Sequence, residues 1–187
     1  MRQLESHIEE ELIAGCVAGK RQAQAQLYQL FAPKMYAIAL RYSKTTHEAD
    51  DILQEAFLKV FQKIESFGRE CPLGYWIKKI VINTALKQNR RKIDQAIKEE
   101  VEDLQIPQGG ESIQSSYNFQ DLLRMVQRLA PSYQTIFNLY AIEGYKHSEI
   151  AEMLGISEGT SKSQYSRARA ILQDMILKEQ QRYEQLG

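Results

Sequence analysis

The sequence predicts an all-α protein made of two small helical domains joined by a flexible acidic linker. Apolar residues recur at three- and four-residue spacing, and the alternation typical of β-strands is nearly absent. The composition breaks at residues 99–116, which hold five acidic residues, no basic residue and the only Gly-Gly pair, a pattern typical of a solvated linker. We therefore expect domains over residues 1–98 and 118–187, the second containing a helix-turn-helix, with the linker over residues 99–117.

The overall charge, the cysteines and the hydropathy indicate in which part of the cell the protein works and whether it inserts into a membrane. The 24 basic and 24 acidic residues cancel, so any attraction to DNA must come from local patches. Cys16 and Cys71 lie far apart and form no CxxC pair, which favours a reducing compartment and predicts a cytoplasmic protein. No apolar run approaches the roughly 20 residues that span a bilayer, and the N-terminus is too acidic for a signal peptide. We expect no direct membrane insertion.

Four helices are expected in the first domain. Their apolar periodicity places them at about residues 8–18, 21–42, 47–64 and 75–98. Glycine and proline predict an irregular loop over residues 66–74, before the fourth helix. Thr45 or Thr46 is the expected N-cap of the third helix, because a threonine hydroxyl accepts a hydrogen bond from the first turn.

A carboxylate pair lies on the polar face of the third predicted helix. Asp51 and Glu55 are one turn apart, and like charges at this spacing repel slightly, which suggests a basic partner. A solvated helix face is the simpler interpretation of the same spacing. A catalytic carboxylate pair would need a nucleophile or metal ligands nearby, and the sequence offers neither.

The fourth predicted helix is strongly basic. It carries seven basic residues against one acidic residue, a local net charge of +6. The basic residues are Lys78, Lys79, Lys87, Arg90, Arg91, Lys92 and Lys98. A basic stripe beside a loop rimmed by Phe67, Tyr75 and Trp76 indicates a nucleic-acid surface. Trp76 itself is interpreted as a core anchor of this helix, since aromatic residues at helical spacing usually pack.

The second domain is organised by a helix-turn-helix over residues 145–172. Two helices, over about residues 117–129 and 131–141, are expected to brace it. Gly155 ends the first helix of the motif, and Ser157 is the expected N-cap of the second. The second helix carries donors suited to phosphates and base edges: Thr160, Lys162, Ser163, Gln164, Ser166, Arg167 and Arg169. An ordinary helical hairpin with a solvated basic face is the alternative, and the polar tail after Leu177 is expected to fray.

No catalytic or metal site is visible in the sequence. His7, His47 and His147 never fall at metal-ligand spacing from each other or from a cysteine. No GxSxG, glycine-rich phosphate loop or HExxH occurs. We therefore expect a protein that is not an enzyme and that needs no cofactor or metal.

Four separated motifs together resemble the extracytoplasmic-function sigma factors of bacterial RNA polymerase. The motifs are ADDILQEAFLKVFQKI, the loop over residues 66–74, GYWIKKIVINTALKQNRRK and EGTSKSQYSRARAIL. The resemblance implies that the first motif docks on core polymerase, that the loop captures an unstacked base, and that the third and fourth motifs contact the minus-ten and minus-thirty-five promoter elements. Polymerase contacts are then expected from Asp51, Gln54 and Glu55. DNA contacts are expected from Asn83, Lys87, Arg90, Arg91, Thr160, Lys162, Ser163, Ser166 and Arg167, with Trp76 at a matching place.

Two positions depart from the family pattern. Ser161 stands where a branched apolar residue is usual, which is expected to loosen helix packing. Gln164 stands where arginine is frequent, which leaves the exact promoter sequence open. The regulon, the inducing signal and any role of Cys16 or Cys71 also stay open.

These observations predict a sigma factor that directs promoter recognition, DNA opening and transcription initiation. The family is usually held inactive by an anti-sigma factor, often membrane-anchored, so such a partner is implied here, though not its identity. The alternative is a stand-alone helix-turn-helix regulator that binds duplex DNA without polymerase docking. A helical interaction protein independent of polymerase would leave both basic surfaces unused.

Overall fold

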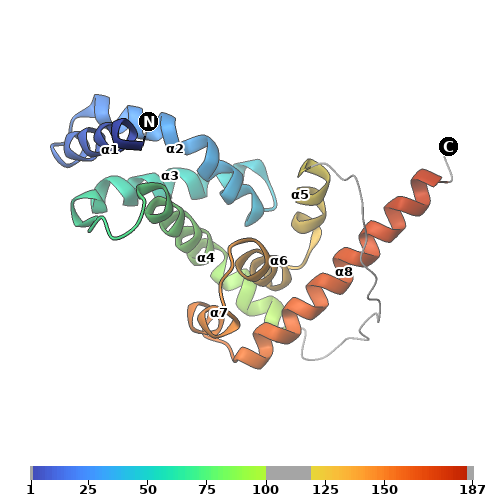
Figure 1. Ribbon diagram of the computed structural model, residues 1–187. Coiled ribbons are helices and arrows are strands. Elements are labelled where there is room, and N and C mark those ends of the chain that lie inside the picture. The colour runs from blue at the N-terminus through green and yellow to red at the C-terminus, as the bar shows by residue number, and fades with distance from the viewer. Residues whose placement is uncertain (1, 100–118, 185–187) are drawn as a thin grey trace. The chain divides into compact units, whose positions relative to one another are not determined.

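All regular structure that the computed structural model describes, over residues 2–99 and 119–184, is helical (Figure 1). This confirms the predicted all-α class. The chain divides into two compact units, residues 1–88 and 89–187. Apart from Glu99, the linker predicted over residues 99–117 lies outside the described residues. Among the residues described, no helix is long and apolar enough to cross a membrane.

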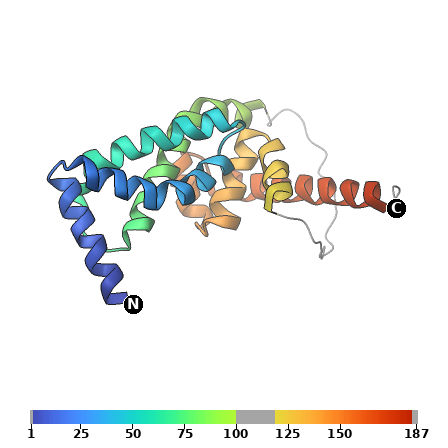
Figure 2. The same cartoon turned by 90° about the horizontal axis from the view of Figure 1, so that it is seen from above.

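The first unit is built on helices close to the predicted ones. They are α1 (Arg2–Val17), α2 (Arg21–Arg41), α3 (Thr46–Lys63), the short 3-10 helix η1 (Ile64–Ser66) and α4 (Leu73–Glu99), whose last residues belong to the second unit. Helix α2 lies along α3, as Figure 2 shows, and α1 packs on α2 and on η1. Helix α4 begins two residues earlier than predicted, because Leu73 is a fully buried core residue rather than part of the loop.

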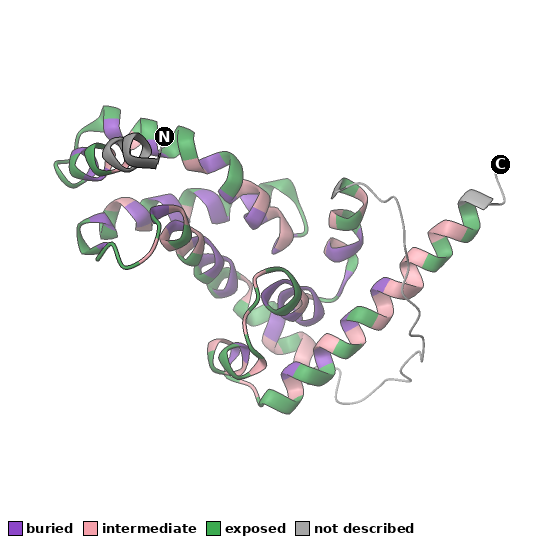
Figure 3. Cartoon of the chain, in the orientation of Figure 1, coloured by how far each residue is buried: buried purple, intermediate pink, exposed green. Residues whose placement is uncertain are grey.

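All four helices contribute buried apolar residues to the core of the first unit, and Figure 3 colours the buried positions purple. Leu27, Ile52 and Ile77 are each at most 1% exposed. Helix α1 comes close to α2 at Gly15, where a β-carbon would lie 2.6 Å from the β-carbon of Ala23. Any larger residue at position 15 would therefore push α1 away from α2.

The predicted cap of α3 is present. The Thr45 hydroxyl accepts a hydrogen bond from the Glu48 backbone N–H at 3.1 Å. The Glu48 carboxylate in turn accepts one from the Lys44 backbone N–H at 2.8 Å. The first bond satisfies an N–H group that a helix start otherwise leaves without a partner, and the second holds the residue just before the cap.

Besides the end of α4, the described residues of the second unit contain four α-helices. They are α5 (Phe119–Arg128), α6 (Pro131–Phe137) with a π-helical turn η2 (Asn138–Ile142), α7 (His147–Leu154) and α8 (Glu158–Glu184). Helices α6 and α7 both pack on α8. Helix α8 continues through Glu184, so the tail expected to fray is helical to that residue, and Lys178 at its start pairs with Asp174 at 2.7 Å.

Helices α7 and α8 form the predicted helix-turn-helix. Gly155 ends α7 in the left-handed conformation, with φ of 63°, which a glycine adopts without strain. The Ser157 hydroxyl accepts a hydrogen bond from the Thr160 backbone N–H at 2.9 Å and so caps α8, as predicted. Ile150 and Leu154 of α7 are buried and hold the two helices together.

Candidate functional site

The first candidate surface is the polar face of α3, where Asp51 and Gln54 are both exposed. Leu58 lies on the same face, four residues after Gln54, and is 62% exposed. The sequence reasoning did not select Leu58, although its position seven residues after Asp51 was a usable signal. A single exposed leucine is ordinary on a protein surface, and here it adds apolar area to an otherwise polar helix face.

The two carboxylates of this face have different surroundings. Asp51 lies 3.7 Å from His47 Nε2, and both side chains are more than half exposed. The Glu55 carboxylate lies 2.6 Å from Lys59 Nζ and also accepts a 2.6 Å hydrogen bond from Gln88 Nε2 of α4. The hydrogen bond from Lys59 is the main cause that lowers the pKa of Glu55. Glu55 therefore connects α3 to α4, whereas Asp51 has no such role in the fold.

The second candidate surface is the basic side of α4. Asn83, Lys87, Arg90 and Arg91 are all exposed. Their spacing of four, three and one residues places them along one face of the helix. Arg90 Nε lies 3.1 Å from Asp94 one turn later, and the Arg90 side chain is 46% exposed. The four side chains predicted to contact DNA thus share one side of a single helix.

Aromatic residues stand at the start of the same helix. Tyr75 is 42% exposed, and the ammonium groups of Lys78 and Lys79 lie 5.3 and 5.0 Å from its ring centre. Trp76 is half-buried and packs on Phe67, with ring centres 5.2 Å apart. Tyr75 rather than Trp76 therefore offers a stacking surface to a base, with cations beside it.

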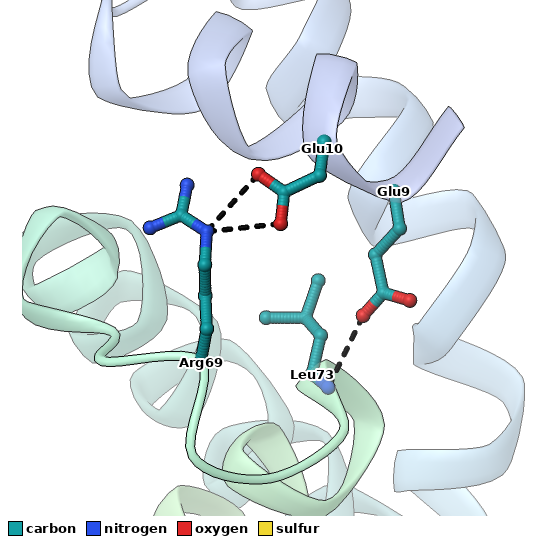
Figure 4. A network of polar contacts seen from close by, with 4 residues as sticks. All are labelled: Glu9, Glu10, Arg69 and Leu73. Atoms are coloured by element: carbon teal, nitrogen blue, oxygen red, sulfur yellow. Dashed lines mark hydrogen bonds and ion pairs between the residues drawn. The ribbon is translucent and has the colours of Figure 1, made fainter. Parts of the chain in front are cut away.

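The loop before α4 borders an open surface cavity of about 350 Å³. Its ends are fixed by Phe67, which is 5% exposed, and by Leu73, which is fully buried. Between them, Arg69 has a backbone φ of 58° and ion-pairs with Glu10 of α1 (Figure 4). The loop is thus a shaped element attached to α1, with a volume inside the range of small-molecule sites, about 300 to 1,000 Å³.

The third candidate surface is the outer face of α8. Lys162, Ser163 and Ser166 are exposed, whereas Thr160 and Arg167 are half-buried. Gln164 is only 3% exposed, so the expectation that it faces DNA is wrong. The buried stripe of α8 runs through Ser161, Gln164, Ala168 and Leu172, and Gln164 falls on it by helical spacing.

Ser161 is accommodated by a partner on the facing helix. Its buried hydroxyl lies 2.9 Å from His147 Nδ1 at the start of α7. The His147 ring is stacked on Tyr140, with ring centres 4.1 Å apart and planes 12° apart. Burial is the main cause that lowers the pKa of His147, and nearby Lys162 lowers it further. The polar residue expected to loosen the packing therefore forms a hydrogen bond between the two helices of the motif.

Over the parts of the chain that the structure describes, no group of three histidine, cysteine, aspartate or glutamate side chains could hold a metal ion. The three surfaces instead combine an exposed polar face with a leucine, a basic helix beside an aromatic ring, and a helix-turn-helix. A basic helix and a helix-turn-helix are features typical of nucleic-acid-binding proteins.

The sequence is similar to those of bacterial sigma factors. The family model "Sigma-70 region 2" matches residues 27–93, and "Sigma-70, region 4" matches residues 119–172. The chain is 30% identical over 166 residues to the ECF RNA polymerase sigma factor SigM of Mycobacterium tuberculosis, covering 89% of this chain and 83% of that protein. It is 26% identical over 172 residues to SigW of Bacillus subtilis, covering 84% and 91%.

The fold is also similar to that of a sigma factor whose structure has been solved. It is the sigma factor RpoE from Bartonella quintana, crystallised in complex with the anti-sigma factor NepR. The match has a TM-score of 0.52 and 25% sequence identity, and covers 81% of this chain and 95% of that chain.

Proposed function

This chain belongs to the extracytoplasmic-function sigma factors of bacterial RNA polymerase. We propose which of its surfaces contact core polymerase and which contact promoter DNA during transcription initiation. It is a sigma factor, which binds core polymerase and promoter DNA. The observation that carries this conclusion is the presence of both sigma-70 regions in order, over residues 27–93 and 119–172. A stand-alone regulator would need only the second unit, so that alternative is not favoured.

The face of α3 is the proposed polymerase contact. Asp51, Gln54 and Glu55 supply polar groups, and Leu58 supplies an apolar centre that loses its water on docking. An exposed leucine ringed by polar side chains matches the usual arrangement of an interface, with an apolar core and a polar rim.

The basic side of α4 is the proposed contact with the minus-ten element. Asn83, Lys87, Arg90 and Arg91 face the same way and can neutralise phosphates. Tyr75 and the cavity under the loop lie at the start of the same helix and offer a stacking surface and a pocket for an extruded base. Opening a duplex requires such contacts, because each unstacked base loses its neighbours.

The outer face of α8 is the proposed contact with the minus-thirty-five element. Lys162, Ser163 and Ser166 are the side chains best placed to reach base edges, with Thr160 and Arg167 at the rim. The domain limits proposed with these roles are residues 1–98 and 118–187, joined by residues 99–117. None of these roles requires a catalytic residue from this chain.

An anti-sigma factor is a further proposed partner, because the similar RpoE structure was solved with one. Since bacterial polymerase and promoter DNA meet in the cytoplasm, the proposed function places this chain there.

The test is to mix the protein with purified core polymerase and to measure co-elution and promoter-specific transcripts. Leu58→Ser should weaken polymerase binding by about 1 to 3 kcal/mol, because a central apolar contact is lost. Leu30→Ser is the matched control, since Leu30 on α2 is 56% exposed and lies outside the α3 face. Absence of any complex with the unaltered protein would refute the proposed function. Equal binding by the two variants would refute the assignment of the α3 face.

A further inference from the structure

Helix α1 holds the loop before α4 through two glutamates (Figure 4). The Glu10 carboxylate accepts hydrogen bonds from Arg69 Nε at 2.9 and 3.0 Å. One residue earlier, the Glu9 carboxylate accepts a hydrogen bond from the Leu73 backbone N–H at 3.1 Å, at the first residue of α4. Two consecutive side chains of α1 therefore hold the middle and the end of one loop.

Arg69 has a backbone conformation that needs such support. Its φ of 58° lies in the left-handed region, and it is the only non-glycine residue with positive φ among those described. A side chain at such a φ is strained, and the conformation persists only when surrounding contacts hold it. The pair with Glu10 is such a contact, because it attaches the strained residue to a helix of the core.

The support itself is rigidly placed. Helix α1 packs on α2 with the close approach at Gly15, and it also packs on η1, which leads into the loop. Glu9, Glu10 and Ile13 of α1 form one wall of the cavity, and loop residues including Arg69 and Cys71 form the other. The shape of the cavity therefore depends on the distance between α1 and the loop.

We propose that Glu9 and Glu10 are positioning residues for promoter opening: they hold the loop in the conformation that keeps its cavity open to an extruded promoter base. This inference rests on the proposed function of the loop. The glutamates act on the loop and do not contact the DNA. A role in stability alone is the competing explanation, but exposed ion pairs contribute little to stability, and Glu10 and Arg69 are each about half exposed.

The two glutamates can be tested in the complex with core polymerase. The DNA probe is a promoter whose downstream element is kept open by mismatched bases. For each unpaired position, two versions of this promoter are compared: one has the normal base, and the other has an abasic site. The ratio of the two dissociation constants measures base capture. The variant is Glu9→Ala with Glu10→Ala, and the control is Glu65→Ala, an exposed glutamate of η1 that does not line the cavity.

The unaltered protein should prefer the normal base over the abasic site by about tenfold at one position, the scale of a single stacked base. The double variant should reduce this preference to about twofold or less, while its affinity for closed promoter duplex stays equal to that of the control. A full preference in the double variant would overturn the proposal. An equal loss of base preference and of closed-duplex affinity would also overturn it, because it would indicate general loss of structure.

Cys71 provides a second measurement that reports the loop itself. It is half-buried in the cavity wall, and maleimide labelling of the free sigma factor can be followed by peptide mass mapping. Removing the glutamates should speed labelling of Cys71 by about threefold or more, as the loop opens locally, with buried Cys16 unchanged as an internal reference. Unchanged Cys71 labelling would overturn the proposal.

The same experiments distinguish a failure of the proposed sigma-factor function from a failure of the proposal for the glutamates. If the unaltered protein bound polymerase and started transcription but showed no base preference at any position, base capture by the loop would be wrong, and this proposal with it. If the unaltered protein bound no polymerase, the proposed function would fail before the loop was tested.

Discussion

Glu55 shows how one side chain can serve both the fold and a binding face. Its carboxylate holds Lys59 and Gln88, and Lys59 also donates a hydrogen bond to the Thr84 hydroxyl at 3.0 Å. These bonds connect the proposed polymerase face on α3 to the basic helix α4. Asp51 lies one turn earlier and has only a loose exposed pair with His47.

We therefore predict different stability effects for the two carboxylates. Glu55→Gln should lower the free energy of unfolding by about 1 kcal/mol at neutral pH, and Asp51→Asn should change it by less than about 0.5 kcal/mol. Because the folded-state pKa of Glu55 is lowered, its contribution is present above its unfolded pKa and disappears as pH falls through the folded one. Thermal melting at neutral and strongly acidic pH checks this, and a Glu55 variant as stable as the Asp51 variant at neutral pH would contradict it.

His147 should make the second unit less stable in mild acid. Burial and Lys162 lower its pKa, so below about pH 6.5 the unfolded chain takes up a proton that the folded chain resists. The free energy of unfolding then falls as pH drops from about 6.5 toward the folded pKa, by at most about 1.4 kcal/mol per pH unit. Nearby Glu158, whose pKa is also lowered, stays ionised in this window.

The measurement compares the unaltered protein with His147→Asn, which keeps a side chain able to hydrogen-bond Ser161. Melting temperatures from about pH 7.5 to 5.5 should fall more steeply for the unaltered protein, since only its position 147 titrates in this range. Parallel curves would show that the protonation of His147 is not coupled to folding.

Some of these residues could be predicted from sequence and others could not. Thr45, Gly155 and Ser157 act within one turn of their own position, so local patterns identified them. The sequence analysis grouped Gln164 with the DNA-facing residues because its side chain is polar. Its helical spacing instead puts it on the buried stripe of α8. The contact between Glu10 and Arg69 joins residues 59 positions apart, and a single sequence carries no signal for such a pair.

At the scale of elements, α8 combines a core stripe with a recognition face. The helix is capped by Ser157 and anchored by Ala168 and Leu172, so its outer side chains have a fixed direction. The hydrophobic pattern predicted this helix well through residue 172. Its continuation to Glu184 was missed, because polar residues hid the packing of Met175 and Ile176.

We predict that Lys162→Ala and Arg167→Ala will separate base reading from phosphate binding. Loss of a base contact should cost about 1 to 3 kcal/mol at one position of the minus-thirty-five element and relax specificity there, whereas loss of a phosphate contact weakens all sequences alike. Lys162 lies 2.7 Å from Glu158, so Glu158→Gln controls for the loss of that pair. Affinities over a library of upstream elements check this, and uniform weakening by both variants would show that neither residue reads bases.

At the scale of the whole molecule, the sequence analysis identified both helical units and their order. This was possible because each motif is formed by residues close together in the sequence, where helical periodicity can be recognised. The cavity beside α1 could not be predicted, because it is formed by residues distant in sequence and by a backbone strain with no compositional mark.

We predict that the loop and the basic helix perform separable steps of promoter opening. Phe67 and Leu73 are core residues, so only residues 68–71 should be replaced, by a Gly-Ser segment of equal length. This loop variant should form the closed complex but lose permanganate-reactive thymines at the downstream element. Arg90→Ala with Arg91→Ala should instead weaken closed binding and reduce its salt slope by about 2, since about two fewer counterions are released.

A promoter melted in advance distinguishes the two defects. It should restore complex formation by the loop variant and leave the arginine variant weak, because phosphate contacts are needed on open and closed DNA alike. Rescue of both variants, or of neither, would contradict separate roles.

The hydrogen bond between His147 and Ser161 also restricts how this protein can evolve. An apolar residue at position 161 would leave the Nδ1 of half-buried His147 without that partner, and replacing His147 alone would leave the buried Ser161 hydroxyl without its own. Each single change is unfavourable, so the two positions are expected to change together along a lineage. Relatives with a branched apolar residue at the position of Ser161 should therefore rarely keep a histidine at the position of His147.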